Sequence, residues 1–296
     1  MEVKKLTLHD NAYPLDLANI AKPPEVLYYV GADPSEWLNR PRVAVVGSRS
    51  VTPYGKQVTE KLSRELAEQG VVIISGLALG VDGIAHAACL DAGGTTVAVL
   101  ANGLDKVYPA NHTALARRII EQGGTLISEY PVGTPSLRHQ FIARNRIVAG
   151  LAQALLITEA AEKSGTLHTA RFALEQGQDV LAVPGSIFSP NSAGTNNLIR
   201  SGAVPVTCAK DVLYALGIDT AVTNTARLRG NNADEQTLID LLQTGITDGH
   251  ALLVQSTLSA PVFNQALTML EISGKIRSLG ILFKSLIRPE QRAGRA

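Results

Sequence analysis

The chain has 296 residues, of which 45% are hydrophobic and 18% are charged. This composition is typical of a folded globular protein and excludes disorder as the default state. The 27 basic and 26 acidic residues leave a net charge of +1, so any surface for an anionic partner must be local. Two cysteines exclude a disulfide framework and a four-cysteine zinc site.

The N-terminal residues lack the apolar core of a signal peptide, and no apolar run approaches about 18 residues. We therefore expect a cytoplasmic protein without membrane association. Residues 1–42 are punctuated by prolines and carry no clear periodicity. Their apolar residues, such as Leu17, Ile20 and Leu27, predict an ordered N-terminal arm that packs on the core, and a solvated tail is the alternative.

Residues 43–217 alternate short β-branched runs with helical stretches. The helical stretches 54–69 and 112–122 each end at a glycine, Gly70 and Gly123. The runs are apolar nearly throughout, as in strands that are buried on both faces of a parallel sheet. They cover residues 43–46, 71–74, 97–100, 125–128, 154–158, 180–183 and 204–207. This alternation predicts an α/β fold with a doubly wound, mostly parallel sheet.

The pattern is lost over residues 218–233, which we interpret as a linker. Residues 234–286 carry three helical stretches, at 234–243, 251–256 and 261–272, followed by short extended pieces. Three helices and a terminal hairpin are typical of a small winged-helix domain. Residues 287–296 are polar and are expected to form a tail.

In a doubly wound sheet, ligands bind where strands pass into helices at their carboxyl ends. The sequence GSRSVTPYG follows the first predicted strand. Its Ser48 hydroxyl and Arg49 guanidinium, next to a helix N-terminus, are suited to a phosphate. The alternative is an ordinary turn with a solvated arginine.

Two further loops have related chemistry. In SGLALGVDGIAH, Gly76 and Gly80 permit a tight turn, while Asp82 and His86 are more simply explained as a cap and a packed histidine. In SGTLHTAR, Ser164, Gly165 and Thr166 provide hydroxyl and N–H groups at a predicted helix start.

The sequence RHQFIARNR at residues 138–146 contains Arg138, Arg144 and Arg146 without an acidic neighbour, and Phe141 lies among them. Cations for phosphates and an aromatic face for a base are typical of single-strand nucleic-acid binding. The alternative is a basic helix start in which Phe141 belongs to the core.

Several enzyme motifs are missing from the sequence. There is no Walker A sequence, no HExxH, no CxxC and no GxSxG. We therefore predict no metal, no cofactor and no catalytic residue.

These loops, in this order, resemble the DNA processing protein A family, also called Smf. The resemblance extends over roughly residues 13–286. Its most specific pieces are VAVVGSRSVTPYG, SGLALGVDGIAH, GLDKVYPANH, SEYPVGTP, RNRIVAGL, EAAEKSGTLHTARFALEQG and VPGSIFSPNSAGTNNLIRSGA.

The resemblance implies a non-enzymatic recombination mediator of natural transformation. Such a protein binds and protects single-stranded DNA and helps to load the RecA recombinase in place of single-strand-binding protein. It also implies an extended Rossmann-like core that forms a homodimer. Carried onto this chain, the DNA-binding residues are Ser48, Arg49, Ser75, Gly76, Gly80, Arg138, Phe141, Arg144, Asn145, Arg146, Ser164, Gly165 and Thr166.

Two other functions remain open. One is a nucleotide-processing enzyme similar to the lonely-guy phosphoribohydrolases, although Glu175 lies too far along the stretch SGTLHTARFALEQG to match the carboxylate of their signature. The other is a winged-helix transcription regulator. The helical stretch 261–272 carries no Arg or Lys, which disfavours reading of bases in the major groove.

Overall fold

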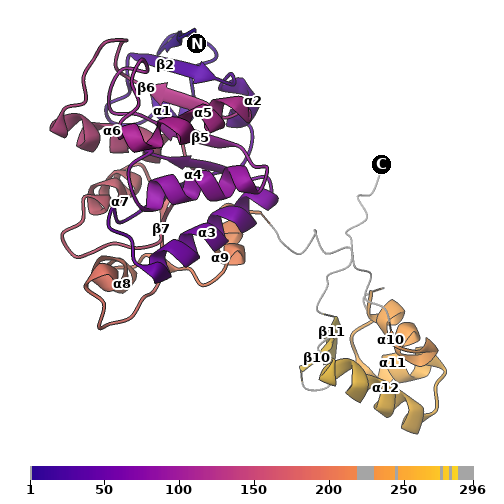
Figure 1. The fold of residues 1–296 in the computed structure, drawn as a ribbon. Helices are drawn as coiled ribbons and strands as arrows, with labels where there is room; N and C mark the ends of the chain where they lie inside the picture. Colours follow the sequence, from indigo (N-terminus) through magenta and orange to yellow (C-terminus); the bar gives the residue numbers. More distant parts are fainter. Residues whose placement is uncertain (1, 219–229, 244–245, 274–275, 280–281, 286–296) are drawn as a thin grey trace. The chain divides into compact units, whose positions relative to one another are not determined.

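The computed structural model describes residues 2–218, 230–243, 246–273, 276–279 and 282–285 (Figure 1). The chain divides into two compact units, residues 1–218 and 219–296, which are described separately. The predicted linker at 218–233 and the tail at 287–296 lie largely or wholly outside the described residues.

One nine-stranded sheet forms the centre of the first unit, in the order β1-β2-β6-β5-β4-β3-β7-β8-β9. The pairs β1–β2 and β2–β6 are antiparallel, and the six pairs from β6 to β9 are parallel. The strands are β1 Lys4–Thr7, β2 Val26–Gly31, β3 Arg42–Val46, β4 Val72–Ser75, β5 Thr96–Val99, β6 Thr125–Ser128, β7 Ala154–Ile157, β8 Asp179–Ala182 and β9 Val204–Pro205. The predicted α/β class with a mostly parallel sheet is confirmed.

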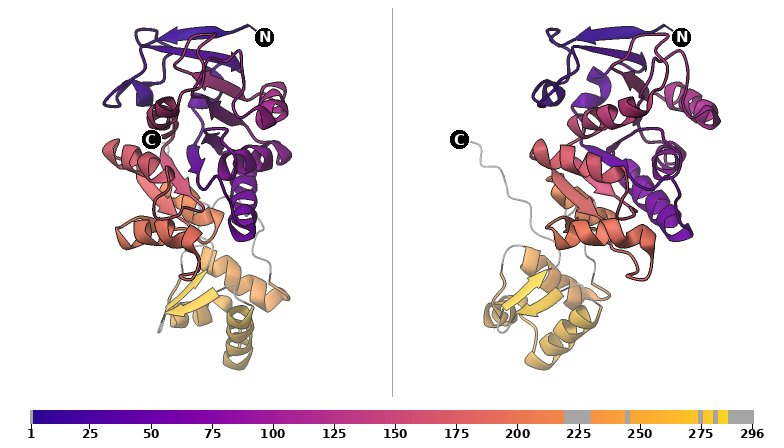
Figure 2. Two further views of the ribbon diagram at one scale, coloured as in Figure 1. Left: turned by 60° about the vertical axis from the view of Figure 1, so that its left-hand side comes forward. Right: turned by 90° about the vertical axis from the view of Figure 1, so that its left-hand side faces the viewer.

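Helices cover both faces of this sheet (Figures 1 and 2). They are α1 Leu15–Ala18, α2 Ser35–Leu38, α3 Pro53–Glu68, α4 Val81–Asp91, α5 Thr113–Glu121, α6 Arg138–Gly150, α7 Thr166–Glu175, α8 Ala193–Arg200 and α9 Ala209–Ala215, with 3-10 turns at η1 Ala110–His112 and η2 Pro190–Ser192. The predicted stops of α3 and α5 are confirmed, because Gly70 and Gly123 adopt positive φ angles of 77° and 79° directly after these helices.

Alternate residues of β3 pack into the hydrophobic clusters on the two faces of the sheet. Val43 and Val45 of β3 pack with α3, α4 and α9, whereas Ala44 and Val46 pack with α1, α6 and α7. All five residues of β3 are buried. The continuous apolar runs in the sequence therefore reflect strands that are covered on both sides.

The N-terminal segment contains strands and helices, although its sequence shows no clear periodicity. Strands β1 and β2 extend the sheet beyond β6, and two short helices, α1 and α2, connect the segments. The segment packs on the core, as Leu17 and Trp37 are both fully buried. Strand β1 carries no buried residue, and β2 joins the rest of the sheet through β6, which is distant in sequence, so local periodicity gave no signal for them.

The second unit contains helices α10 Ala233–Gln243, α11 Gly249–Ser256 and α12 Ala260–Ile272, followed by the antiparallel strands β10 Ile276–Leu279 and β11 Leu282–Ser285. Leu238, Leu252, Phe263 and Leu270 form its core. The three helices and hairpin predicted from the sequence are present.

The order of the sheet creates one place where ligands are expected. From β3, the chain proceeds to β4 on one side, and it later returns to β7 on the other side. The loops that follow β3 and β7 therefore lead to helices on opposite faces, and a crevice opens between them at the carboxyl ends of the strands.

Candidate nucleic-acid interface

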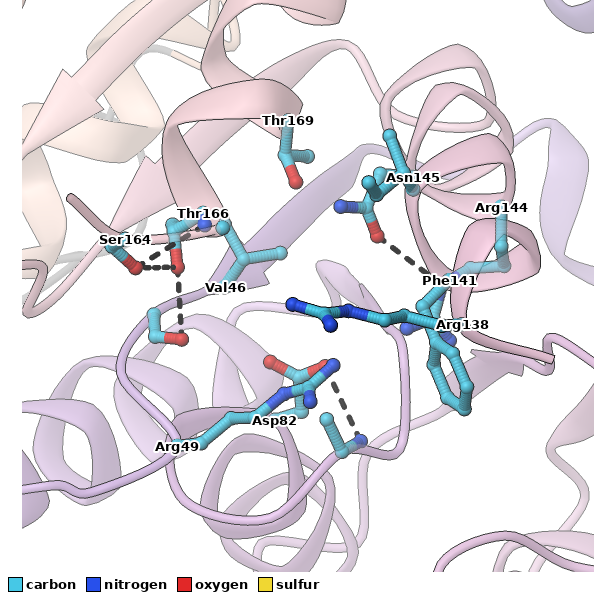
Figure 3. Close-up of a pocket in the computed structure, with 14 residues that line it drawn as sticks. Val46, Arg49, Asp82, Arg138, Phe141, Arg144, Asn145, Ser164, Thr166 and Thr169 are labelled. Carbon is cyan, nitrogen blue, oxygen red and sulfur yellow. Dashed lines mark hydrogen bonds between the residues drawn. The ribbon is translucent and has the colours of Figure 1, made fainter. Parts of the chain in front are cut away.

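A pocket of about 380 Å³ occupies this crevice (Figure 3). Its walls come from the loops after β3, β4 and β7 and from the first turns of α6 and α7. We call it the Arg49 pocket. Among the predicted residues it is lined by Arg49, Arg138, Phe141, Arg144, Asn145, Ser164, Gly165 and Thr166.

The loop after β3 is attached to the end of β7 by Glu159. The Ser48 N–H donates to the Glu159 carbonyl at 2.8 Å, and the Thr52 N–H and hydroxyl both donate to the Glu159 carboxylate at 3.0 Å. A Cβ on Gly55 would lie 1.7 Å from that carboxylate, so only glycine fits there. The Ser48 hydroxyl accepts from the Ser50 N–H and is nearly buried. Ser48 therefore shapes the loop and does not line the pocket.

Arg49, by contrast, extends from this fixed loop into the pocket. Its guanidinium lies over the Phe141 ring, 5.5 Å from the ring centroid. Figure 3 shows Arg49 and Arg138 reaching toward one another from opposite walls. Neither guanidinium forms a hydrogen bond or ion pair with any described residue, and both residues are exposed. Two unpaired cations that converge on one cavity favour an anionic ligand.

Helix α6 supplies one wall through a single stripe of side chains. Arg138, Phe141 and Asn145 are spaced by three and four residues, so they share one face of the helix. The helix start is fixed, since the Leu137 N–H donates to the Gln140 side-chain oxygen at 2.5 Å. The stripe therefore presents a cation, an aromatic ring and an amide side by side.

Arg144 has a different role from Arg138, because it is 4% exposed. Its guanidinium donates to the carbonyls of Gly76 and Val99, at the ends of β4 and β5. Gly76 makes room for it, since a Cβ there would lie 2.4 Å from Nη2. Burial lowers the pKa of Arg144 to about 10, and Asp82 opposes this shift. Arg144 thus joins α6 to the strand ends, and only its edge reaches the pocket.

Asp82 is the buried carboxylate beside Arg144. It accepts hydrogen bonds from the N–H groups of Gly76 at 3.1 Å and Ala78 at 3.3 Å. Burial raises its pKa, while Arg144 and these N–H groups lower it. The prediction that Asp82 caps α4 is therefore wrong: Asp82 lies inside the helix and binds the loop before it, and no side chain caps the helix start. Gly80 has a φ of 78° and lies against the backbone of Ser48, which explains its lack of a side chain.

The start of α7 forms the third wall. The Ser164 hydroxyl donates to the Thr166 hydroxyl at 2.9 Å and accepts from the Thr166 N–H at 3.2 Å. The Thr166 hydroxyl donates to the Gly47 carbonyl at 3.0 Å, which joins this turn to the loop after β3. A Cβ on Gly165 would meet nothing within 4 Å, so Gly165 leaves space where the start of α7 lines the pocket.

Five predicted residues do not line the Arg49 pocket: Ser48, Ser75, Gly76, Gly80 and Arg146. Ser75 is fully buried, and its hydroxyl donates to the Val45 carbonyl at 2.6 Å. Arg146 is held by a two-pronged ion pair with Glu129 at 2.7 and 2.8 Å and donates to the Lys22 carbonyl. The structure gives the Ser75 and Arg146 side chains structural contacts in place of the ligand contacts that the sequence predicted.

The family model for DNA recombination-mediator protein A matches residues 4–226, about three quarters of the chain. The chain belongs to this family. A second model, for the winged-helix domain of DprA, matches residues 223–280. The resemblance seen in the sequence is thereby confirmed, and the second unit is a winged-helix domain.

Known members of the family are similar over the first unit. Protein Smf of Escherichia coli is 47% identical over 59% of this chain and 47% of its own length. The structure of DNA processing protein A from Streptococcus pneumoniae has a TM-score of 0.68 and 42% identity, covering 72% of this chain and 74% of that one. The Helicobacter pylori protein has a TM-score of 0.65 and 34% identity, covering 73% and 95%. That structure concerns its single-stranded DNA binding mode. The chain spans about half the length of the first curated relatives it matches.

Within this recombination-mediator fold, sequence reasoning missed Glu159 and Tyr108. Glu159 follows directly after a buried strand at the crossover point of the sheet, and this position was a usable signal. Tyr108 lies in the family sequence GLDKVYPANH, and its ring packs 5.3 Å from the Phe141 ring. The interpretation of His86 as a packed histidine is confirmed, as the residue is fully buried.

The described residues contain neither a metal-binding cluster nor a membrane-spanning helix. No group of three or more His, Cys, Asp or Glu side chains is placed to hold a metal ion. No helix within the described ranges has both the length and the apolar character needed to cross a membrane.

Proposed function

We propose that the chain binds single-stranded DNA in the Arg49 pocket. The observation that carries this proposal is the convergence of two unpaired guanidiniums, Arg49 and Arg138, beside the partly exposed ring of Phe141. Guanidiniums bind phosphates through charge-assisted hydrogen bonds, and an aromatic ring stacks on any base. The combination favours a nucleic-acid strand without sequence preference.

The start of α7 supports the same ligand. Ser164, Gly165 and Thr166 line the Arg49 pocket from the side opposite α6. The positive end of a helix dipole favours an anion there. A phosphate bridging Arg49 and α7 would leave the attached base free to reach Phe141.

We further propose that this binding serves recombination in natural transformation. In this role the chain protects incoming DNA and helps RecA to replace single-strand-binding protein. The family assignment and the Helicobacter pylori relative, whose structure concerns single-stranded DNA binding, support this role. A homodimer would place two Arg49 pockets on one strand.

We propose no enzymatic activity for the pocket. The carboxylate considered for a lonely-guy-like hydrolase, Glu175, pairs with Arg171 on the exposed face of α7. Among the described residues that line the pocket, Asp82 is the one carboxylate, and it is occupied by two N–H donors and faces Arg144. A carboxylate held in this way is suited to fixing a loop, not to acting as a general base.

We propose that residues 43–217 carry the DNA site and that the winged-helix domain, residues 234–286, has a packing or partner-binding role. Helix α12, which occupies the position of a recognition helix, has no Arg or Lys to read bases. Duplex binding is therefore not expected from this unit.

Equilibrium binding of oligothymidylate across a salt series tests the DNA proposal. Each neutralised phosphate of a single strand should contribute a slope of about −0.7 in log K against log salt. A duplex of the same length serves as the control and should bind more weakly. A flat salt response or a preference for duplex would contradict the proposal. The role in recombination is tested separately, by RecA filament assembly on DNA coated with single-strand-binding protein.

A further inference from the structure

A second, smaller cavity of about 60 Å³ adjoins the Arg49 pocket on the other side of Arg49 and Phe141. We call it the Tyr108 cavity. The two cavities share four residues, Arg49, Ala78, Phe141 and Arg144. The walls that belong to the Tyr108 cavity alone are mostly apolar and include Leu79, Tyr108 and Pro109. The two cavities are therefore neighbours, and Phe141 lines both of them.

Tyr108 presents a half-exposed ring to the Tyr108 cavity. Tyr108 is 51% exposed. The plane of its ring makes an angle of 60° with the plane of the Phe141 ring. Its hydroxyl forms no hydrogen bond with any described residue. The ring contributes little to the core and has no polar task in the folded chain, so its exposed face is available to a ligand.

The loop that carries Tyr108 is fixed on both sides. Before it, the Asn102 amide donates to the carbonyls of Gly103 at 2.8 Å and Lys106 at 2.6 Å. After it, His112 Nδ1 lies 2.8 Å from the Leu77 carbonyl, which ties the loop to the turn after β4. Binding a ligand on Tyr108 therefore requires no ordering of the backbone, which favours affinity.

We propose that Tyr108 is a second base-stacking position next to Phe141, so that one DNA strand places neighbouring bases on the two rings. The inference rests on the proposed binding of single-stranded DNA. The apolar walls suit a nucleobase and not a phosphate, for which Arg49 and Arg138 lie in the adjoining pocket. Because the rings are tilted by 60°, bases stacked on both cannot remain stacked on each other. The strand is held unstacked at this step.

The simplest test compares Tyr108→Ala with the wild type in binding the shortest oligothymidylate that reaches full affinity. Loss of one stacking partner should weaken binding by about 5- to 150-fold. Tyr108→Phe should bind like the wild type, because the hydroxyl has no partner. Tyr214→Ala, which removes an 87% exposed tyrosine from α9, is the matched control and should have no effect.

A second experiment separates base stacking from mechanical support of Phe141. Each thymine of the oligonucleotide is replaced in turn by an abasic site, and binding is measured to the wild type, Tyr108→Ala and Phe141→Ala. In the wild type, we expect an abasic site to weaken binding at two positions of the oligonucleotide. In Tyr108→Ala, an abasic site should have no further effect at one of these positions, and in Phe141→Ala it should have no further effect at the other. If both variants lose sensitivity at the same position, Tyr108 only supports Phe141 and the proposal is wrong.

Photocrosslinking of the wild-type chain covers the case in which Tyr108→Ala does not fold. An oligonucleotide containing 5-iodouracil should crosslink to the peptide that contains Tyr108. Absence of this peptide, together with a crosslink at Phe141, would overturn the inference. The proposed function itself fails under a different result: a wild type that does not bind single strands, or one whose binding is unchanged by Arg49→Ala and Arg138→Ala.

Discussion

The central carbon of the Arg49 guanidinium lies 5.5 Å from the centroid of the Phe141 ring. One residue comes from the loop after β3 and the other from α6, so the contact joins two walls of the Arg49 pocket. A cation over a ring contributes about 0.5–1 kcal/mol at an exposed site. We expect the two residues to be coupled in DNA binding, so that the double alanine variant loses less affinity than the sum of the single losses.

Replacement of Arg49 by alanine should weaken single-strand binding by about 1–3 kcal/mol, since it removes a charge-assisted phosphate contact. The melting temperature should stay close to that of the wild type, because Arg49 is exposed and outside both cores. Arg64→Ala, which removes one exposed charge from α3, should bind normally. An Arg49→Ala chain that is unfolded would show a structural residue instead.

Phe141 should act mainly on binding. We expect Phe141→Ala to cost about 1–3 kcal/mol of single-strand affinity through lost base stacking. A core phenylalanine would instead cost about 3–5 kcal/mol of folding stability. Phe141→Trp should keep its affinity if the ring faces a base, whereas close packing would cost about 1–3 kcal/mol of stability. Urea unfolding and oligonucleotide titration of the same samples distinguish these outcomes.

Replacement of Arg144 should lower folding stability, whereas replacement of Arg138 should lower DNA affinity. Arg144→Met leaves Asp82 buried without its cation and leaves the carbonyls of Gly76 and Val99 without their donor. Loss of a buried charge partner costs about 3–5 kcal/mol, so the urea midpoint should fall strongly. Arg138→Met should leave the midpoint unchanged and weaken binding. Equal midpoints for the two variants would refute the role assigned to Arg144.

His86 should make the protein less stable in acid. Burial lowers its pKa from 6.5 to about 3, with smaller effects from His112 and Arg144. Between these two pKa values the unfolded chain binds a proton that the folded chain does not. Stability should therefore fall as the pH falls from 6.5, by up to about 1.4 kcal/mol per pH unit.

The raised pKa of Asp82 acts in the opposite direction, so the His86 contribution must be isolated by comparison. His86→Gln removes the titrating ring and should show a shallower fall in unfolding free energy with acid than the wild type. His139→Gln, at an exposed position of α6, should keep the wild-type slope. Parallel slopes for wild type and His86→Gln would mean that the buried ring does not account for the acid sensitivity.

Much of the central sheet could be predicted, because parallel strands covered on both faces leave continuous apolar runs. Val43–Val46 and Ala154–Thr158 are examples of such runs. The loops that line the Arg49 pocket follow from the same pattern, since carboxyl ends of parallel strands share one edge. The strands of residues 4–7 and 26–31 were not predictable, because β1 carries no buried residue and the partner of β2 in the rest of the sheet, β6, lies far along the chain.

The grouping of Arg138, Arg144 and Arg146 into one site did not take the helical spacing of α6 into account. At 3.6 residues per turn, Arg144 and Arg146 lie about 120° and about 80° from Arg138 in opposite directions around the helix. The three guanidiniums therefore cannot share one face, and the helical spacing alone could have shown this. Their individual partners could not be deduced: Glu129 precedes Arg146 by 17 residues, and only the packed sheet brings the two together.

The pairing of β2 with β6 also constrains how the chain is made. Tyr28 is paired with Ser128, so β1 and β2 can pair with each other but cannot join the rest of the sheet until one hundred further residues exist. A ribosome that adds about 5–20 residues per second needs about 5–20 s for this stretch. Trp37, the single tryptophan of the chain, is fully buried and donates to the Thr125 hydroxyl at 3.0 Å. Its fluorescence on stalled nascent chains should therefore report the moment at which the N-terminal strands dock.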